Sequence, residues 1–231
     1  MKRGASAILL AALAASPAAQ SSEITFTALS ANVNQPGSPV TIRLNRWSTD
    51  DERAPVLAAL NPAPTDPAAA TPASATGQGA RGAAGRGRGR SGGARGRGGA
   101  AAAPLTPIAA MTAAIGRAPT VGYIWTTDVT GYSIKYAYHS SSPAGERIVL
   151  VTDRRLGAYS PGWKPAAATG AGTPARAADY DFTLVEIRMD PKGAGEGKAS
   201  LTTTVVADNE ARTVALENYA AAPAILEHVK R

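Results

Sequence analysis

A long segment without large apolar side chains divides this chain and limits what it can fold into. From Asn61 to Pro104 the sequence consists mainly of Ala, Gly, Pro, Thr and Arg, and it contains no Leu, Ile, Val or aromatic residue. Ordering a residue costs about 1 to 2 kcal/mol of backbone entropy, which the burial of apolar side chains must offset. We therefore predict a disordered insertion at 61–104, so that one core must be built from the residues on its two sides.

The N-terminus has the three-part pattern of a secretory signal peptide. Lys2 and Arg3 precede an uncharged, apolar stretch that ends at Ala15, and small residues follow as far as Ala19. The apolar stretch is well short of the ~20 residues that span a bilayer. We therefore predict a cleaved signal peptide at 1–19, a periplasmic or secreted protein, and no transmembrane segment after cleavage.

The formal net charge of +7 and the isoelectric point of about 9.9 suggest an anionic partner at first sight. The excess positive charge lies in the predicted leader and in the insertion, however, where six arginines face the single acid Asp66. The rest of the chain has equal numbers of basic and acidic residues. An anionic partner is therefore expected at the insertion and not on the folded surface.

An arginine-glycine tract occupies the middle of the insertion. Its arginines are Arg81, Arg86, Arg88, Arg90, Arg95 and Arg97. Such tracts bind nucleic acids through phosphate contacts and stacking, but this one has no aromatic residue and belongs to a chain that is predicted to be exported. We interpret the tract as a solvated insertion and do not expect a nucleic-acid partner. Adhesion to anionic polymers or lipids of the envelope is the alternative.

Short segments in which apolar and polar residues alternate make up most of the remaining chain. Nine of them are predicted to be strands, at 23–30, 40–47, 121–127, 132–139, 147–153, 180–189, 199–207, 213–218 and 224–229. Most of the links are short and rich in turn-forming residues, and the parallel βαβ pattern is missing. We predict a mainly β domain, bordering on α+β, that is an antiparallel sandwich or barrel formed by 20–60 and 105–231.

One or two short helices are predicted between the second and third strands. Thr49 and Glu52 have the spacing of a capping box, although Pro55 leaves open a later start for this helix. Thr106 is a predicted N-cap, with Pro107 at the first helical position and apolar residues at spacings of three and four after it.

Several short sequences are shared with a known family. They are 46–49, 121–124, 131–132, 136–137, 147–150, 152–154, 182–186 with Arg188, 195–198 and 216–219. On these sequences the chain, from about Val40 to its C-terminus, resembles a family of exported bacterial β-rich proteins with no assigned function. The resemblance implies export and one compact β-rich domain, and it transfers no catalytic residues. The insertion at 61–104 departs from the family, where a shorter helical connection is expected.

Aromatic residues gather on two neighbouring predicted strands. Tyr123 and Trp125 share one face of the first strand, and Tyr132, Tyr136 and Tyr138 share one face of the next. Cross-strand packing in the core is the first interpretation. The alternative is a ligand cleft in which the hydroxyl groups orient the ligand. We expect an exported, non-catalytic binding or accessory module of the cell envelope, with a small ligand or envelope component as its partner.

Two charged residues follow each other on one face of the predicted strand 180–189. Glu186 and Arg188 are interpreted as an ion pair on the solvated side, and the alternative places Glu186 in a cleft as a ligand contact or general base. The glycine-rich segment 190–197 is predicted to be a turn. It is not a phosphate-binding loop, because positions 192 and 199 lack the required glycine and hydroxyl residues.

Few residues are available for catalysis or metal binding. The chain has no cysteine and two histidines. Ser140, His139 and Asp153 carry the residue types of a catalytic triad, but no nucleophile-elbow sequence accompanies them. We predict no catalytic residue, metal or cofactor, and a small cofactor-independent hydrolase or isomerase is kept as an alternative.

Overall fold

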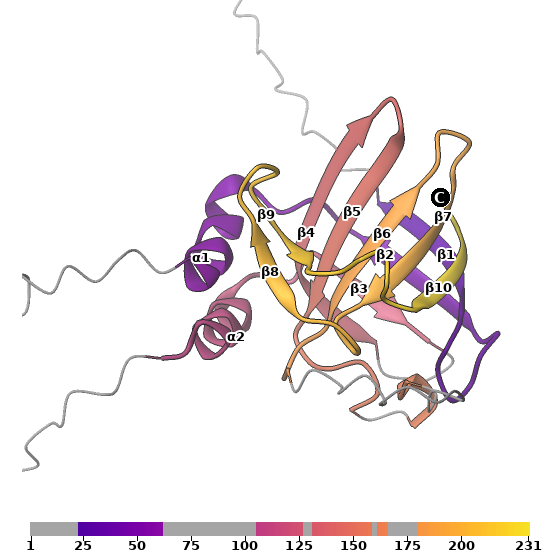
Figure 1. Ribbon diagram of the computed structural model, residues 1–231, viewed down its shortest axis with the longest axis horizontal. Helices are drawn as coiled ribbons and strands as arrows, with labels where there is room; N and C mark the ends of the chain where they lie inside the picture. The colour runs from indigo at the N-terminus through magenta and orange to yellow at the C-terminus, as the bar shows by residue number, and fades with distance from the viewer. Residues whose placement is uncertain (1–22, 62–104, 127–130, 159–160, 166–179) are drawn as a thin grey trace, which may run out of the picture.

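The computed structural model describes residues 23–61, 105–126, 131–158, 161–165 and 180–231 (Figure 1). Its strands are β1 (Ile24–Ser30), β2 (Pro39–Leu44), β3 (Gly122–Trp125), β4 (Tyr132–Ser142), β5 (Gly145–Thr152), β6 (Leu184–Met189), β7 (Ala194–Ala199), β8 (Val205–Asp208), β9 (Thr213–Leu216) and β10 (Ala224–Lys230). Its helices are α1 (Asp50–Leu60), α2 (Pro107–Arg117) and a short 3-10 helix at Pro161–Trp163. The predicted leader and the arginine-glycine tract lie outside the described residues.

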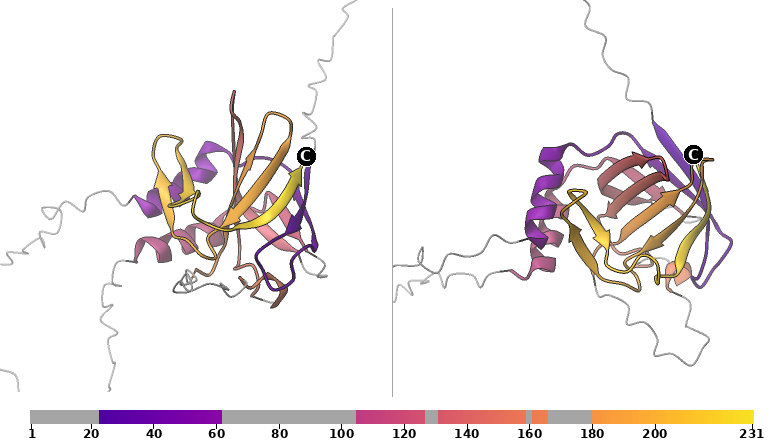
Figure 2. Two further views of the ribbon diagram at one scale, coloured as in Figure 1. Left: turned by 45° about the vertical axis from the view of Figure 1, so that its right-hand side comes forward. Right: turned by 45° about the horizontal axis from the view of Figure 1, so that its top comes forward.

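Eight of the strands close an antiparallel barrel, which confirms the predicted fold class and decides between sandwich and barrel. The strand order around the barrel is β1-β10-β7-β6-β5-β4-β3-β2. The last strand, β10, lies between β1 and β7 and pairs with both. Figure 2 shows β10 beside β1 on the side of the barrel that faces away from the helices.

Inward-facing side chains from all sides of the barrel form its core. They include Phe26, Ile42, Leu44, Ile124, Ile134, Ile148, Leu150, Val185, Ile187, Leu226 and Val229. An eight-stranded barrel is just wide enough for side chains to fill. The barrel interior of this protein is therefore a packed core and not a binding cavity.

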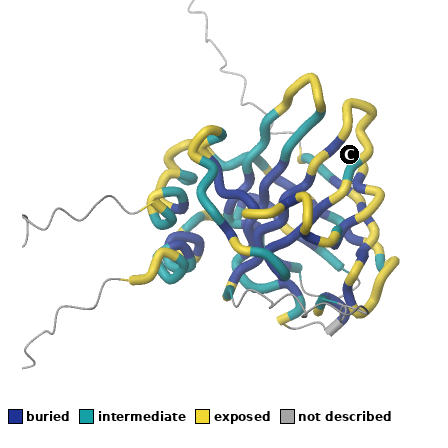
Figure 3. The backbone as a smooth tube through the Cα atoms, in the orientation of Figure 1, coloured by how far each residue is buried: buried dark blue, intermediate teal, exposed yellow. Residues whose placement is uncertain are grey.

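A second apolar layer covers one outer side of the barrel. Helices α1 and α2 and the β8–β9 hairpin pack against the outward side chains of β4, β5 and β6, among them Tyr136, Val149 and Leu184. Figure 3 shows the buried backbone running through these strands, while the hairpin tips are exposed. Among the described residues, no helix is long and apolar enough to cross a membrane.

A bulge changes which aromatic residues of β4 share a face. Ile134 pairs with Thr152, but Tyr136, two residues further on, pairs with the residue directly before Thr152. This extra residue reverses the alternation of side chains along the strand. Tyr132 belongs to the barrel core, whereas Tyr136 and Tyr138 contact the outer layer. The predicted single aromatic face is therefore wrong.

The glycine-rich segment that was predicted to be a turn contains a strand. The turn ends at Gly193, and β7 follows it and pairs with β6 and β10. A Cβ atom on Gly195 would lie 2.5 Å from the carbonyl oxygen of Arg188, so the backbones approach more closely than a side chain allows. The predicted strand at 199–207 is correspondingly wrong in its first half, because β7 ends at 199 and β8 begins at 205.

The capping box at the start of α1 is confirmed, and an arginine reinforces it. The Glu52 backbone N–H donates to Thr49 Oγ1 at 3.3 Å, and the Thr49 N–H donates to Glu52 Oε2 at 3.0 Å. Arg46 donates to both Glu52 carboxylate oxygens at 2.7 Å. The helix accordingly begins at Asp50 and includes Pro55. Mainly through this hydrogen-bonded Arg46, the pKa of Glu52 falls to about 2.

Because the pKa of Glu52 is lower in the folded chain, part of the free energy of unfolding depends on pH and is lost in acid. A carboxyl group whose pKa is lower in the folded chain stabilises that chain fully above its ordinary pKa of 4.5. This contribution is lost as the pH falls through about 2. Urea unfolding of the natural chain and of Glu52→Gln should differ most near neutral pH and converge toward pH 2. If the free energies of unfolding of the two chains differed equally at all pH values, Glu52 would not be the source of the pH dependence. In the Arg46→Gln background, the difference between the chains with and without Glu52→Gln should be smaller.

Candidate functional site

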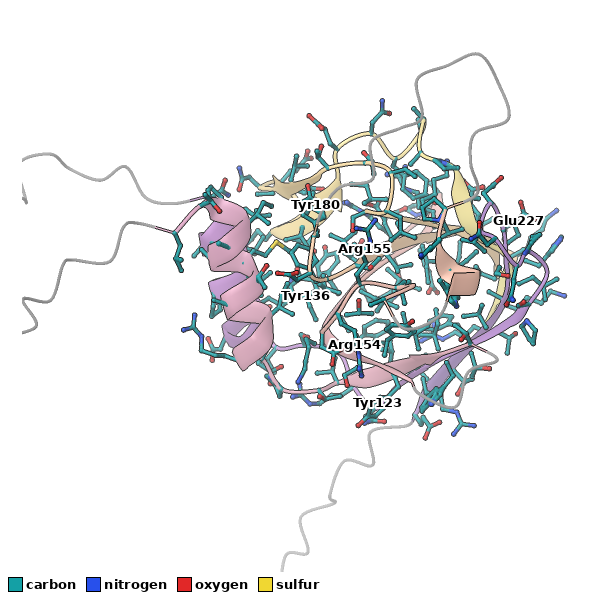
Figure 4. The ribbon with its side chains drawn as sticks, turned by 90° about the horizontal axis from the view of Figure 1, so that it is seen from below. Tyr123, Tyr136, Arg154, Arg155, Tyr180 and Glu227 are labelled. Atoms are coloured by element: carbon teal, nitrogen blue, oxygen red, sulfur yellow. The ribbon has the colours of Figure 1, made fainter. Side chains whose placement is uncertain are left out.

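The five aromatic residues of the predicted ligand cleft do not lie together. Figure 4 shows Tyr123 on the outer wall of the barrel and Tyr136 between the barrel and the helices. Trp125 accompanies Tyr123, with 5.3 Å between their ring centroids. Tyr132 lies in the barrel core, and the ring of Tyr138 lies under the guanidinium group of Arg53.

The buried tyrosine hydroxyl groups have partners inside the protein. Tyr132 accepts a hydrogen bond from the Gly157 N–H at 3.3 Å, and the Tyr136 hydroxyl lies 2.7 Å from Thr213 Oγ1. Burial raises the pKa of Tyr136 above its ordinary value. These two tyrosines hold loops and strands in place, and they are not exposed for a ligand.

Glu186 is fully buried, so the prediction that its ion pair lies on the solvated side is wrong. The pair with Arg188 is present at 2.9 Å, and Arg147 Nε donates to the same carboxylate oxygen, Oε1, at 3.0 Å. The other oxygen, Oε2, accepts from the backbone N–H of Leu216 at 3.2 Å. The carboxylate is buried because β9 packs over β6. With donors on both oxygens, Glu186 has the environment of a structural anchor and not of a general base.

The arginines that pair with Glu186 also contact the β8–β9 hairpin and the segment that follows it. Arg147 also contacts Asp208 at the end of β8, at 2.7 Å. Arg188 lies 3.8 Å from the centroid of the Tyr219 ring, and the Lys198 ammonium group lies 4.7 Å from it. Burial raises the pKa of Tyr219. The charged groups thus tie the β8–β9 hairpin and the segment that follows it to the barrel wall.

The histidine cluster does not have the geometry of a catalytic triad. His139 Nε2 lies 3.1 Å from Glu146 Oε2 and 3.2 Å from Ser141 Oγ, so one ring nitrogen serves both groups. A triad needs the acid and the nucleophile on opposite ring nitrogens. Asp153, the acid considered from the sequence, pairs instead with Arg154 at 3.3 Å, at the other end of β5.

The structure contains a pocket of about 490 Å³ at the end of the barrel where β5 leaves it. We call it the barrel-end pocket. Among the residues that the structure describes, Arg155, Leu156, Gly157, Ala158, Lys164 and Pro165 line it. Figure 4 looks toward this end of the barrel and labels Arg155 there. A smaller pocket, of about 190 Å³, lies beside α1, where Arg53 is held by Asp50 and by the carbonyl oxygen of Arg212.

One wall of the barrel-end pocket is the loop after β5, and the barrel fixes it in place. The Leu156 N–H donates to Thr183 Oγ1 at 2.9 Å, and Thr152 Oγ1 donates to the carbonyl oxygen of Arg154 at 2.7 Å. Gly157 adopts a φ of 86°, a left-handed conformation that favours glycine. A Cβ atom on Gly157 would also lie 3.1 Å from the backbone of Trp163. These contacts hold the described part of this wall against the barrel.

The other wall is the segment 162–165, and the connection between β1 and β2 fixes it. The Asn34 N–H donates to the Lys164 carbonyl oxygen at 2.9 Å, and the Gln35 N–H donates to that of Gly162 at 3.1 Å. Val33 and Pro165 form an isolated β-bridge. Trp163, which belongs to this segment, is buried in the barrel core. Backbone hydrogen bonds and the isolated bridge thus hold this wall against the connection between β1 and β2.

Sequence reasoning missed the barrel-end pocket because its residues belong to no motif. The consecutive residues Arg154 and Arg155 follow a predicted strand and indicate positive charge at its end. Lys164 begins a second low-complexity stretch, which was predicted to be a long loop. Contacts with distant segments hold the two walls: Thr183 accepts from the Leu156 N–H, and the 33–35 segment pairs with 162–165. No family model, curated protein or solved structure matches this chain.

Proposed function

We propose that this protein is a non-catalytic binding module of the cell envelope and that a small molecule is its ligand, held in the barrel-end pocket. The observation that carries the proposal is the pocket itself, whose volume of about 490 Å³ lies within the ~300 to 1,000 Å³ of small-molecule sites. The mouth of a β-barrel is one of the places where such sites occur. The leader pattern at 1–19 supports a location in the envelope.

The fixed walls of the pocket favour binding. Ordering a loop around a ligand costs free energy, and a preformed site avoids this cost. Here the Thr183 and Tyr132 hydroxyl groups hold one wall, and the 33–35 segment holds the other. By contrast, the carboxylate of Glu186 and the ring nitrogen of His139 are engaged in contacts within the protein. These contacts make a binding function a better fit than a catalytic one.

A substitution that fills the pocket tests this function. Ala158 lines the pocket and is exposed, so Ala158→Phe should occupy the ligand space without disturbing the core. In a fragment screen by heteronuclear NMR, we expect shift changes to concentrate at 155–158 and 164–165. We expect Ala158→Phe to weaken these hits about tenfold or more, because the ring takes the place of the ligand.

A matched control places the same ring elsewhere. Ala144 is exposed in the turn between β4 and β5, so Ala144→Phe should leave the fragment affinities unchanged. Thermal unfolding of both variants checks that each one folds. Hits that map to another surface, or hits that are indifferent to Ala158→Phe, would refute the assignment of the ligand to this pocket.

A further inference from the structure

The fold is built from two parts of the chain, 23–61 and 105–231, which are joined covalently only through 62–104. We call 23–61, which contains β1, β2 and α1, the β1–α1 segment. Figure 1 shows its indigo and violet elements in both the barrel wall and the helix layer. The chain has no cysteine, so no disulfide adds a second covalent link. Noncovalent contacts therefore hold the β1–α1 segment in place.

The β1–α1 segment completes the wall of the barrel. Its strand β1 pairs with β10 and its strand β2 pairs with β3, so the β1–β2 hairpin fills the space between two later strands. Phe26, Ile42 and Leu44 are fully buried in one core together with residues of the later strands. The hairpin therefore depends on 105–231 to bury its apolar side chains.

The segment is also held outside the barrel wall. The Ser48 N–H donates to the Ala137 carbonyl oxygen at 2.9 Å, and the Ala137 N–H donates to Ser48 Oγ at 3.0 Å. Helix α1 packs on α2, and Arg53 donates to the Arg212 carbonyl oxygen at 3.1 Å. Each of these contacts would be the same if a second copy of the chain supplied the segment.

The length of the link makes such an exchange possible. Residues 62–104 can span up to roughly 140 Å at ~3.3 Å per residue. The effective concentration of a chain's own segment is millimolar for a short flexible link and falls as the link lengthens. At protein concentrations near this range, the segment of a second copy therefore competes for the same place. The exchange of identical elements between copies is a low-cost route to a dimer.

We propose that two copies of this protein exchange their β1–α1 segments and form a dimer in which each barrel is completed by the other copy. The space between β10 and β3 is thus an interaction surface, and its partner is the β1–α1 segment of a second copy. The exchange extends to the barrel-end pocket, because the 33–35 segment that holds its 162–165 wall then comes from the other copy. This inference does not depend on the proposed ligand.

Cysteines placed on separate copies test the exchange. Thr27 and Lys230 are exposed and lie opposite each other on β1 and β10. One copy carries Thr27→Cys and the other carries Lys230→Cys, and the two are unfolded together in urea, refolded at about 1 mM and oxidised. A disulfide joins the two copies where β1 of one lies beside β10 of the other. Because the natural chain has no cysteine, no other thiol competes.

A matched control places the second cysteine away from β1. Lys192 is exposed in the turn between β6 and β7, and neither strand pairs with β1. We expect about tenfold or more heterodimer from Thr27→Cys with Lys230→Cys than from Thr27→Cys with Lys192→Cys. Copies that are mixed after each has folded should also give about tenfold less heterodimer, because exchange requires β1 and β2 to leave the barrel.

Two further measurements complete the test. The natural chain should elute as a dimer with the native amide spectrum after refolding at about 1 mM, and as a monomer after refolding at about 5 μM. A chain with both Thr27→Cys and Lys230→Cys, refolded at the lower concentration, should form the disulfide internally. If it does not, the β1–β10 pairing on which the proposal rests is overturned. Heterodimer no more abundant than with Lys192→Cys, or equally abundant after mixing folded copies, would overturn the exchange.

Discussion

Replacing Glu186 with glutamine is expected to lower the free energy of unfolding by about 3 to 5 kcal/mol, because it removes the charge that neutralises two arginines. The carboxylate is 0% exposed and accepts hydrogen bonds from Arg147, Arg188 and the Leu216 backbone. A glutamine has almost the same shape but leaves the Arg147 side chain, itself partly buried, with Asp208 as its remaining partner. Equilibrium unfolding in urea measures the loss.

The adjacent strand offers a matched control for this substitution. Glu196 pairs with Lys198 at 3.4 Å, but its side chain is 51% exposed, and exposed ion pairs contribute little. Glu196→Gln should change the free energy of unfolding by less than about 0.5 kcal/mol. If Glu186→Gln proves equally mild, then the buried ion pairs do not anchor the hairpin to the barrel.

Ending the chain at Ala222 is expected to prevent the barrel from forming. This truncation removes β10, and with it the hydrogen bonds to β1 and β7 and the buried side chains of Ile225, Leu226 and Val229. Two strand edges would then stand open, and the core would lose part of its wall. Far-ultraviolet circular dichroism and the dispersion of amide proton shifts would both show the loss of the native fold.

Adding back the missing strand tests the explanation. A synthetic peptide of residues 223–231 supplies the same hydrogen bonds and side chains, and we expect it to restore native amide shifts in the truncated chain. A chain that ends at Lys230 keeps all of β10 and should fold. A native spectrum from the truncated chain alone would mean that β10 is dispensable for closure.

The sequence was informative wherever local pattern determined the structure. Alternation placed Phe26 and Ile42 in the core, and the capping residues Thr49 and Thr106 marked both helix starts. The sequence pattern was misleading where contacts between distant segments determined which residues form a strand. The glycines of β7 are poor strand formers, yet Gly195 fits because β6 passes too close for a side chain.

The candidate site was less predictable than the fold for the same reason. The alternation around Ile134 and Tyr136 gives no sign of the bulge that separates the aromatic residues of β4. The exposure of Glu186 was misjudged because the hairpin that buries it comes later in the chain. The walls around Arg155 and Lys164 are held by contacts with distant parts of the chain, Leu156 with Thr183 and Lys164 with Asn34.

The pairing of β1 with β10 also determines when this protein completes its fold. Thr27 pairs with Lys230, so the barrel closes only after the two ends of the described chain have met. Contacts between residues so far apart in sequence slow the search for the native state. Until β10 arrives, β1 and β7 each expose an unpaired edge that attracts other extended chains. A closure that depends on such distant segments therefore leaves these two edges unpaired for longer than a closure by neighbouring strands would.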